Sequence, residues 1–213
     1  MHNQYFIGVD LGQRRDRTAI AVIERAESLA DRPDPVTWTR ERITLQQVRH
    51  IERMPLGTPY TLVAQRIARI ADKLAARGSC AVAVDATGVG LPVVDSLRLP
   101  AAAWRLMPVT IVYADRENYA DGFWRVPKRD LIASLQLAFD AGAFTIARDC
   151  RDTPALIEEL TSMRANRRPT GAVQYASPGA AHDDLAIALA LAWWAAQTRR
   201  PAQLGVDKPL LSI

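Results

Sequence analysis

The sequence contains few of the residues that small proteins use as metal ligands or covalent links. There are two cysteines, Cys80 and Cys150, and only three histidines in 213 residues. The cysteines lie far apart with no Cys or His neighbour, which excludes zinc-ligand spacing and a disulfide framework. We expect two buried, reduced thiols, as is usual for a cytosolic protein.

Long apolar runs are also missing. The longest run covers residues 185–196, whereas a membrane-spanning helix needs about 20 apolar residues. We therefore expect a buried helix there and no membrane as a partner. The first ten residues lack the charged and apolar blocks of a signal peptide.

Three motifs that would indicate other enzymes are absent. Residues 86–90, Ala-Thr-Gly-Val-Gly, lack the lysine of a Walker A loop, and no Gly-x-x-x-x-Gly-Lys-Ser/Thr occurs elsewhere. There is no Gly-x-Ser-x-Gly nucleophile elbow. No Gly-x-Gly-x-x-Gly follows a strand, so the sequence does not support dinucleotide binding.

Arginine, by contrast, is abundant. The formal charge is +4, and 24 of the 27 basic residues are arginines. The planar guanidinium group matches phosphate better than the point charge of lysine, so the composition favours nucleic-acid binding. The alternative is that the arginine content only reflects a GC-rich genome.

The order of predicted elements indicates an α/β domain. We predict one domain over residues 1–200 and a poorly ordered tail at 201–213. Strands are predicted at 5–11, 18–24, 36–44, 80–85, 104–112 and 143–147, and helices at 59–77, 89–97, 127–141, 153–164 and from 183. Residues 114–126 are expected to be irregular, and 167–171 to form a turn between two short strands. This order predicts a mixed central sheet with helices on both faces.

Acidic residues stand at the ends of predicted elements. Asp10 ends the first strand, Asp85 ends the central strand, and Asp183 and Asp184 open the final helix. Such ends can converge at the carboxyl edge of an α/β sheet. Converging carboxylates repel one another unless a cation lies among them, and their oxygens suit Mg²⁺ or Mn²⁺. Two such ions can promote phosphodiester cleavage.

Each of these acids also has an ordinary structural explanation. Asp10 could form a turn and Asp85 could shape the loop that follows it. Asp183 and Asp184 could be a helix cap and a first-turn acid that favours the helix dipole. Their joint occurrence at element ends favours the metal site.

Four sequence motifs point to a known family. They are Gly-Val-Asp-Leu-Gly at 8–12 with Asp-Arg-Thr-Ala-Ile-Ala-Val at 16–22, Val-Asp-Ala-Thr-Gly-Val-Gly at 84–90, Val-Pro-Lys-Arg-Asp-Leu-Ile at 126–132, and His-Asp-Asp-Leu-Ala-Ile-Ala-Leu-Ala-Leu-Ala at 182–192. Together they resemble the nuclease domain of phage terminase large subunits, over nearly the whole chain. The resemblance implies a ribonuclease-H-like fold.

The resemblance also assigns site residues. It implies that Asp10, Asp85 and Asp184 are the catalytic carboxylates and hold two Mg²⁺ or Mn²⁺ ions, with Asp183 as a further ligand. Many relatives have another acid three residues after the second aspartate of the last motif, where this chain has Ile187. Either Asp183 or Asp184 could therefore be the main ligand, and we favour Asp184.

Other candidates lie around these motifs. Lys128 stands at a predicted helix start, where anions are favoured, beside Arg125 and Arg129. A second basic group contains Arg164, Arg167 and Arg168. Both groups could contact the DNA backbone, or they could simply be solvated.

Two further residues lie close in sequence to the acidic motifs. His182 could assist proton transfer or hold the loop before the last helix. Asp16 is predicted to be a turn residue.

The activity that the resemblance implies is metal-dependent cleavage of concatemeric viral DNA during packaging. It also implies double-stranded DNA, a packaging ATPase, a portal and a small terminase subunit as partners, in the cytoplasm of a bacterial host. The length leads us to expect either a standalone nuclease or the nuclease half of a motor.

Three other functions compete with this interpretation. They are a junction-resolving nuclease of the same fold, a sugar-kinase or actin-like ATPase, and a non-catalytic DNA-binding or assembly module. The insert Gln-Arg-Arg-Asp-Arg at 13–17 argues against the ATPase.

Overall fold

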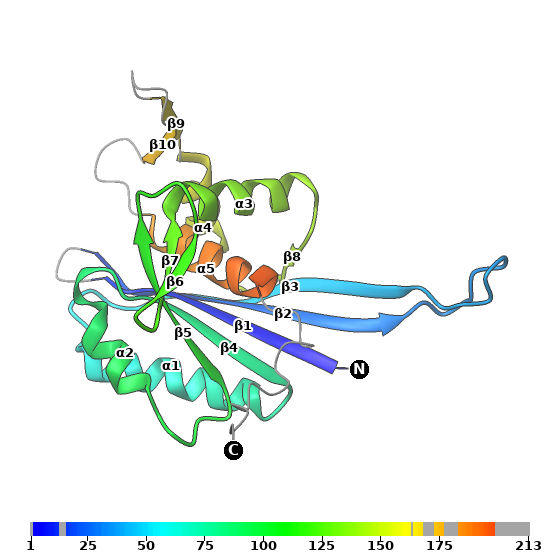
Figure 1. The fold of residues 1–213 in the computed structure, drawn as a ribbon, viewed down its shortest axis with the longest axis horizontal. Coiled ribbons are helices and arrows are strands. Elements are labelled where there is room, and N and C mark those ends of the chain that lie inside the picture. Colours follow the sequence, from blue (N-terminus) through cyan, green and yellow to red (C-terminus); the bar gives the residue numbers. More distant parts are fainter. Residues whose placement is uncertain (1, 13–15, 163, 168–172, 177–182, 199–213) are drawn as a thin grey trace, which may run out of the picture.

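A mixed sheet lies between two groups of helices in the computed structural model, which describes residues 2–12, 16–162, 164–167, 173–176 and 183–198. Helices α1 (Tyr60–Ala75) and α2 (Leu91–Leu97) cover one face of the sheet. Helices α3 (Lys128–Asp140), α4 (Thr153–Ser162) and α5 (Asp184–Thr198) cover the other face (Figure 1). The predicted α/β architecture, with helices on both faces, is therefore confirmed.

The main sheet has eight strands in the order β6-β7-β5-β4-β1-β2-β3-β8. Strands β1, β2 and β3 are antiparallel, and β4, β5 and β7 continue parallel to β1. The bounds are β1 His2–Asp10, β2 Ala19–Leu29, β3 Arg42–Arg53, β4 Ser79–Asp85, β5 Arg105–Val112, β6 Asn118–Ala120, β7 Phe123–Pro127 and β8 Thr145–Ile146. A separate pair contains β9 (Arg164–Arg167) and β10 (Val173–Ala176), and a 3₁₀ turn covers Gly88–Gly90.

Helix α5 is apolar all round because it has neighbours on both sides. It packs on β1 and β2 beneath and on α3 and α4 above, and the side chains of residues 184–196 are buried. Gly8 permits this close approach, since a Cβ atom there would lie 2.0 Å from the carbonyl oxygen of Ala188. The predicted buried helix is confirmed, and its position is fixed by small residues in the sheet.

Alternate residues of the central strands divide between two cores. Tyr5, Ile7 and Val9 point into the core under α1, while Phe6 points into the core under α5. This is the period-2 alternation of a strand covered on both faces. It predicts that Asp10, which follows Val9, lies on the α5 side.

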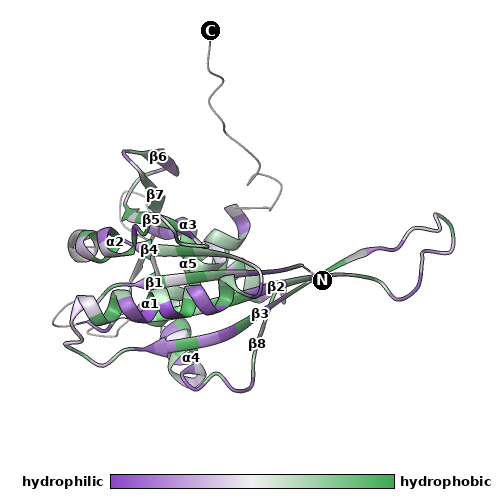
Figure 2. Ribbon diagram, turned by 90° about the horizontal axis from the view of Figure 1, so that it is seen from below, coloured by the Kyte–Doolittle hydropathy of each residue, from purple (hydrophilic) through white to green (hydrophobic). Residues whose placement is uncertain are grey.

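Strands β2 and β3 extend beyond the body of the molecule as a long hairpin (Figures 1 and 2). Strand β1 pairs with β2 only as far as Glu27, and β8 pairs with β3 only at Gln47 and Val48. We call residues 28–46 the arm. Its exposed large apolar side chains are Leu29, Val36, Trp38, Ile43 and Leu45.

The strand predicted at 36–44 is placed wrongly. Residues 35–37 form a turn, and the strand begins only at Arg42 and continues to Arg53. The Asp34 carboxylate accepts hydrogen bonds from the backbone N–H groups of Val36 and Thr37. This local bonding competes with strand pairing, as is typical of aspartate in turns.

The prediction that residues 114–126 are irregular is also wrong. This segment contains β6 and most of β7, and β7 pairs parallel with β5. Trp124 packs edge-on against Trp194 of α5 with ring centroids 5.6 Å apart. Tertiary packing of this kind overrides weak local propensity. Pro127 ends β7 and precedes α3 instead of being its first residue.

Cys80 and Cys150 are both buried and free, as predicted. Burial raises the pKa of the Cys80 thiol to about 12, so that thiol stays protonated and unreactive. Within the described part of the chain, no helix is long and apolar enough to cross a membrane. The predictions for His182, Arg168 and the tail at 201–213 lie outside the described residues.

Candidate active site

Two predicted acids lie at the carboxyl ends of neighbouring parallel strands. Strand β1 pairs with β4 so that Val9 is opposite Val84, and each strand then ends in an aspartate, Asp10 or Asp85. The alternation described above directs both residues toward α5. The structure thus places Asp10 and Asp85 next to each other at one edge of the sheet.

The start of α5 brings two more carboxylates to this edge. The carbonyl oxygen of Asp183 accepts the N–H of Ile187 at 2.9 Å, so Asp183 caps the helix and Asp184 is its first residue. Asp184 is buried, with 4% of its surface exposed, whereas Asp183 is half-buried. Both the cap position and the acidic first turn suit the helix N-terminus.

The four carboxylates interact electrostatically. The pKa of Asp10 is raised well above its usual value, first by burial and then by the charges of Asp85, Asp184 and Asp183; Lys128 opposes this rise. The pKa of Asp85 is also raised, mainly by burial. We call Asp10, Asp85, Asp183 and Asp184 the acidic cluster.

Two members of the cluster also have structural partners. Lys128, the first residue of α3, donates a hydrogen bond to Asp183 Oδ2 at 2.7 Å. Asp85 Oδ1 accepts the backbone N–H of Thr87 at 2.8 Å, and this bond shapes the loop after β4. The loop-shaping role considered for Asp85 is therefore real, and it coexists with a position in the cluster.

A second charged group lies directly behind Asp184. The guanidinium of Arg53, at the end of β3, forms an ion pair with Glu159 of α4, and its Nε lies 3.7 Å from Asp184 Oδ2. Glu159 Oε2 accepts the backbone N–H of Ala186 at 2.9 Å. Burial raises the pKa of Glu159 to about 7, despite the opposing effects of this N–H and of Arg53.

The acidic cluster fits a divalent cation in its chemistry. Its donors are hard carboxylate oxygens, and the charges of the other three aspartates add to burial in raising the pKa of Asp10, against the opposing charge of Lys128. Among the described residues, however, no three His, Cys, Asp or Glu side chains are close enough to hold one ion as they stand. Ion binding would therefore have to draw the carboxylates together.

The residues predicted to contact DNA lie in two separate parts of the chain, and the structure does not describe all of them. Arg125 forms an ion pair with Asp121, and Arg129 with Asp115 and Asp130, while both arginine side chains remain over 40% exposed. Both lie beside Lys128, at the end of β7 and the start of α3. Arg167 ends β9, whereas Arg168 is not among the described residues.

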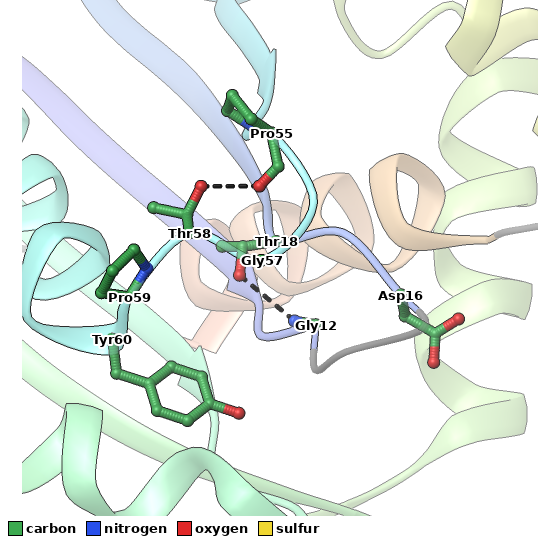
Figure 3. A pocket seen from close by; sticks show the side chains of 8 residues that line it. All are labelled: Gly12, Asp16, Thr18, Pro55, Gly57, Thr58, Pro59 and Tyr60. Atoms are coloured by element: carbon green, nitrogen blue, oxygen red, sulfur yellow. Dashed lines mark hydrogen bonds between the residues drawn. The ribbon is translucent and has the colours of Figure 1, made fainter.

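A separate pocket of about 300 Å³ lies between residues that connect β1 to β2 and residues that connect β3 to α1 (Figure 3). It is lined by Gly12, Asp16, Thr18, Pro55, Gly57, Thr58, Pro59 and Tyr60. The backbone N–H of Gly12 donates to Thr18 Oγ1, which closes the loop that holds Asp16. Asp16 lines this pocket, whereas none of the four cluster aspartates does.

Sequence reasoning missed Arg53 and Glu159. From Ile51 onward, β3 alternates so that Arg53 shares the buried face of Ile51, an unusual place for a charge. Glu159 follows Leu156 by three residues on the buried face of α4. A charged residue on an apolar face is the signal that could have identified both.

Comparison with solved structures finds the same fold in terminase nuclease domains. The chain is similar to the large terminase nuclease from thermophilic phage G20c with bound magnesium, at 23% identity and TM-score 0.54, covering 90% of this chain and 81% of that one. The Thermus phage P74-26 large terminase nuclease domain matches at 20% identity and TM-score 0.54, covering 90% and 78%. The chain has the fold of a terminase nuclease domain.

A more distant structure extends the comparison. The large terminase nuclease domain from bacteriophage SPP1 with bound Mn matches at 12% identity and TM-score 0.51, covering 91% of this chain and 86% of that one. No protein-family model and no curated protein matches the sequence. The predicted ribonuclease-H-like fold is thus confirmed by structure, at identities too low to transfer an activity.

Proposed function

We propose that this protein is a metal-dependent DNA endonuclease of the terminase large-subunit type. The observation that carries the proposal is the acidic cluster, in which half-buried Asp10 lies at the carboxyl edge of the sheet within electrostatic reach of three other carboxylates. Solved terminase nucleases of the same fold have been obtained with magnesium or Mn bound. An acidic cluster that binds divalent metal ions would support hydrolysis of phosphodiester bonds. We assign this activity to the packaging of concatemeric viral DNA.

Within this proposal, Asp10, Asp85 and Asp184, together with Asp183, hold two Mg²⁺ or Mn²⁺ ions. When bound, such ions supply Lewis-acid stabilisation of the departing oxygen and a more acidic water. The chain's own contribution is to bring the carboxylates to one edge of the sheet, where a bound cation would favour their ionised form. Lys128 restrains Asp183 through its ion pair and offers a cation for a phosphate near the scissile bond.

DNA binding is proposed to depend on the backbone rather than on base sequence. Arg125 and Arg129 keep exposed guanidinium groups near Lys128, and Arg167 and Arg168 would extend the contact. His182, directly before the cluster, would assist proton transfer. Since the contacts are to phosphates, binding should weaken steeply with salt. A packaging ATPase, a portal or a small terminase subunit would be the protein partners, in the cytoplasm of a bacterial host.

The proposal is tested by plasmid cleavage in Mg²⁺ or Mn²⁺. The Asp10→Ala variant should abolish cleavage while keeping the circular-dichroism spectrum of the wild type. Asp31→Ala, which removes an exposed carboxylate far from the cluster in the arm, should cleave normally. Undiminished cleavage by Asp10→Ala would refute the assignment.

A parallel gel separates the nearest alternative. Linear duplex and a four-way junction are offered to the wild type under the same conditions. Cleavage of linear duplex is expected, whereas a strong preference for the junction would indicate a junction-resolving nuclease of the same fold. If no cleavage occurs and Mn²⁺ leaves the melting temperature unchanged, the protein is a non-catalytic module.

A further inference from the structure

The side chain of Arg53 lies between Asp184 of the acidic cluster and Glu159 of helix α4. Arg53 ends β3 on the face that α5 covers, and its side chain is only 19% exposed. In the sheet, Arg53 pairs with Ala19 and Ala19 pairs with Asp10. Arg53 and Asp10 therefore lie in the same row across three strands.

The guanidinium group connects two elements that frame the cluster. One contact is the ion pair with Glu159 of α4, and the other is the approach of Nε to Asp184 Oδ2 at 3.7 Å. The Arg53 backbone is itself held, because its N–H donates to Asp152 Oδ2 at 3.0 Å just before α4. The planar fork of N–H donors in a guanidinium group can contact two carboxylates at once. The ammonium group of lysine lacks this geometry.

Glu159 connects Arg53 to the first turn of α5. Its Oε2 accepts the N–H of Ala186, one of the helix N–H groups without an intrahelical partner, while its Oε1 faces Arg53. Glu159 and Asp184 are both almost completely buried, at 5% and 4% exposure. The start of α5 is thus fixed to β3 through one cation and two carboxylates.

We propose that Arg53 is a positioning residue for the acidic cluster, which orients Asp184 and the start of α5 toward Asp10. This inference rests on the proposed function, because it concerns how the same carboxylates hold a cation. Groups that orient metal ligands from behind commonly affect metal affinity as strongly as some ligands do. The competing role is simple charge competition, in which Arg53 opposes a cation and its removal tightens metal binding.

Mn²⁺ binding without DNA distinguishes these roles, measured from the electron paramagnetic resonance signal of free Mn²⁺. Arg53→Met should weaken Mn²⁺ affinity about 10- to 100-fold, and Arg53→Lys, which keeps the charge, should weaken it less. Arg49→Met is the matched control, because Arg49 lies on the same strand and pairs with Glu24 away from the cluster. That control should bind Mn²⁺ as the wild type does.

A double variant protects the test against misfolding. Arg53→Met leaves Glu159 buried without its cation, which is strongly destabilising. Arg53→Met/Glu159→Gln removes both charges and keeps an oxygen to accept the Ala186 N–H, so it should fold and still bind Mn²⁺ weakly. In cleavage assays it should require more Mn²⁺ while the KM for DNA is unchanged.

The outcomes separate the two proposals. A wild type that binds Mn²⁺, with the folded Arg53→Met or double variant binding equally well or more tightly, overturns the positioning role alone. If neither folds, Arg53→Lys decides, and wild-type affinity in that variant overturns the positioning role. A wild type that neither binds Mn²⁺ nor cleaves DNA overturns the proposed function together with this inference.

Discussion

The two ends of the β2–β3 hairpin depart from ordinary burial in opposite ways. At the body end, Arg53 is inserted among buried acids, and Asp184 and Glu159 are almost inaccessible to solvent. At the far end, the arm extends away from the body (Figure 2). It exposes apolar side chains, and Trp38 is 80% exposed. Soluble proteins usually bury such apolar groups and leave such charges at the surface.

Substitutions at the two ends of the hairpin should therefore differ in how much they affect stability and the proposed chemistry. The body end is framed by β1, β3, β4, α4 and α5, so a change there should affect both stability and the proposed chemistry. Beyond β1 and β8, each arm strand has only the other as its neighbour. Basic and acidic residues balance in residues 28–46, so the arm has no net charge to attract DNA.

Asp10→Asn should produce the largest contrast between activity and stability. We expect cleavage to be lost and the melting temperature of the metal-free protein to rise, because one half-buried carboxylate that repels its neighbours becomes neutral. Plasmid cleavage and thermal unfolding in a chelator provide the two readouts. A lower melting temperature would show that the cluster stabilises the fold instead of straining it.

Gly8→Ala should cause the largest loss of stability. A Cβ atom at Gly8 would meet backbone atoms of Ala188 and Ala192 at 2.0 and 2.4 Å, and such overpacking costs typically about 1–3 kcal/mol, occasionally more. Urea unfolding measures this cost. Gly57→Ala is the control, because a Cβ atom there meets nothing within 4 Å and only the positive φ of 78° opposes it. Equal losses in the two variants would contradict tight packing of α5 on β1.

The pH dependence of stability should distinguish Glu159 from Glu52. The pKa of Glu159 rises from 4.5 to about 7 on folding, so the folded state binds its proton more tightly and stability falls as pH rises through that window. The pKa of Glu52 is lowered to about 2 by hydrogen bonds from His50 and Arg66, so its contribution is lost only in acid. We expect Glu159→Gln to flatten the stability profile between about pH 5 and 7.5.

Glu52→Gln is the matched control in that experiment. It is made in a His50→Gln background, because the imidazole of His50 hydrogen-bonds Glu52 and its charge would otherwise enter the comparison. In that background the loss of stability should stay constant over the same pH interval, because Arg66 still favours the ionised carboxylate of Glu52. Urea unfolding at several pH values measures both variants. A profile for Glu159→Gln that runs parallel to the wild type would mean that Glu159 titrates near its ordinary pKa.

Trp38→Gly in the arm should have the smallest effect. Trp38 is exposed and has a φ of 55°, which glycine adopts more easily. The free energy of unfolding should change by less than about 0.5 kcal/mol, and plasmid cleavage should be unchanged. A clear loss of cleavage would show that the arm contributes to the site, and the contrast between the hairpin ends would then fail.

Sequence reasoning located the cluster because its acids follow regular strands. The apolar run before Asp85 predicts a central strand, and parallel neighbours necessarily end at the same edge of the sheet. The helix that begins at Asp184 was visible as an apolar run bounded by charge. Periodicity and element ends were therefore enough to predict that these carboxylates lie at one edge of the sheet.

The network behind the cluster could not be predicted in the same way. A β-bulge opposite Val22 and Ile23 shifts the register of β3, so that Val48 and Ile51 face the same core at odd spacing. This interrupts the alternation along β3, so only the short stretch from Ile51 onward indicates that Arg53 lies on the buried face. The contact between Glu159 and the start of α5 joins residues 27 positions apart, and no local pattern encodes it.

The most direct test of the account is a crystal structure of the protein soaked in Mn²⁺, with anomalous scattering used to locate the metal. The account predicts Mn²⁺ density between Asp10, Asp85 and Asp184, with Asp183 close enough to serve as a further ligand. Density should be absent in the Asp10→Asn crystal. A soaked wild-type crystal with no metal at this edge and with these carboxylates still apart would contradict the account.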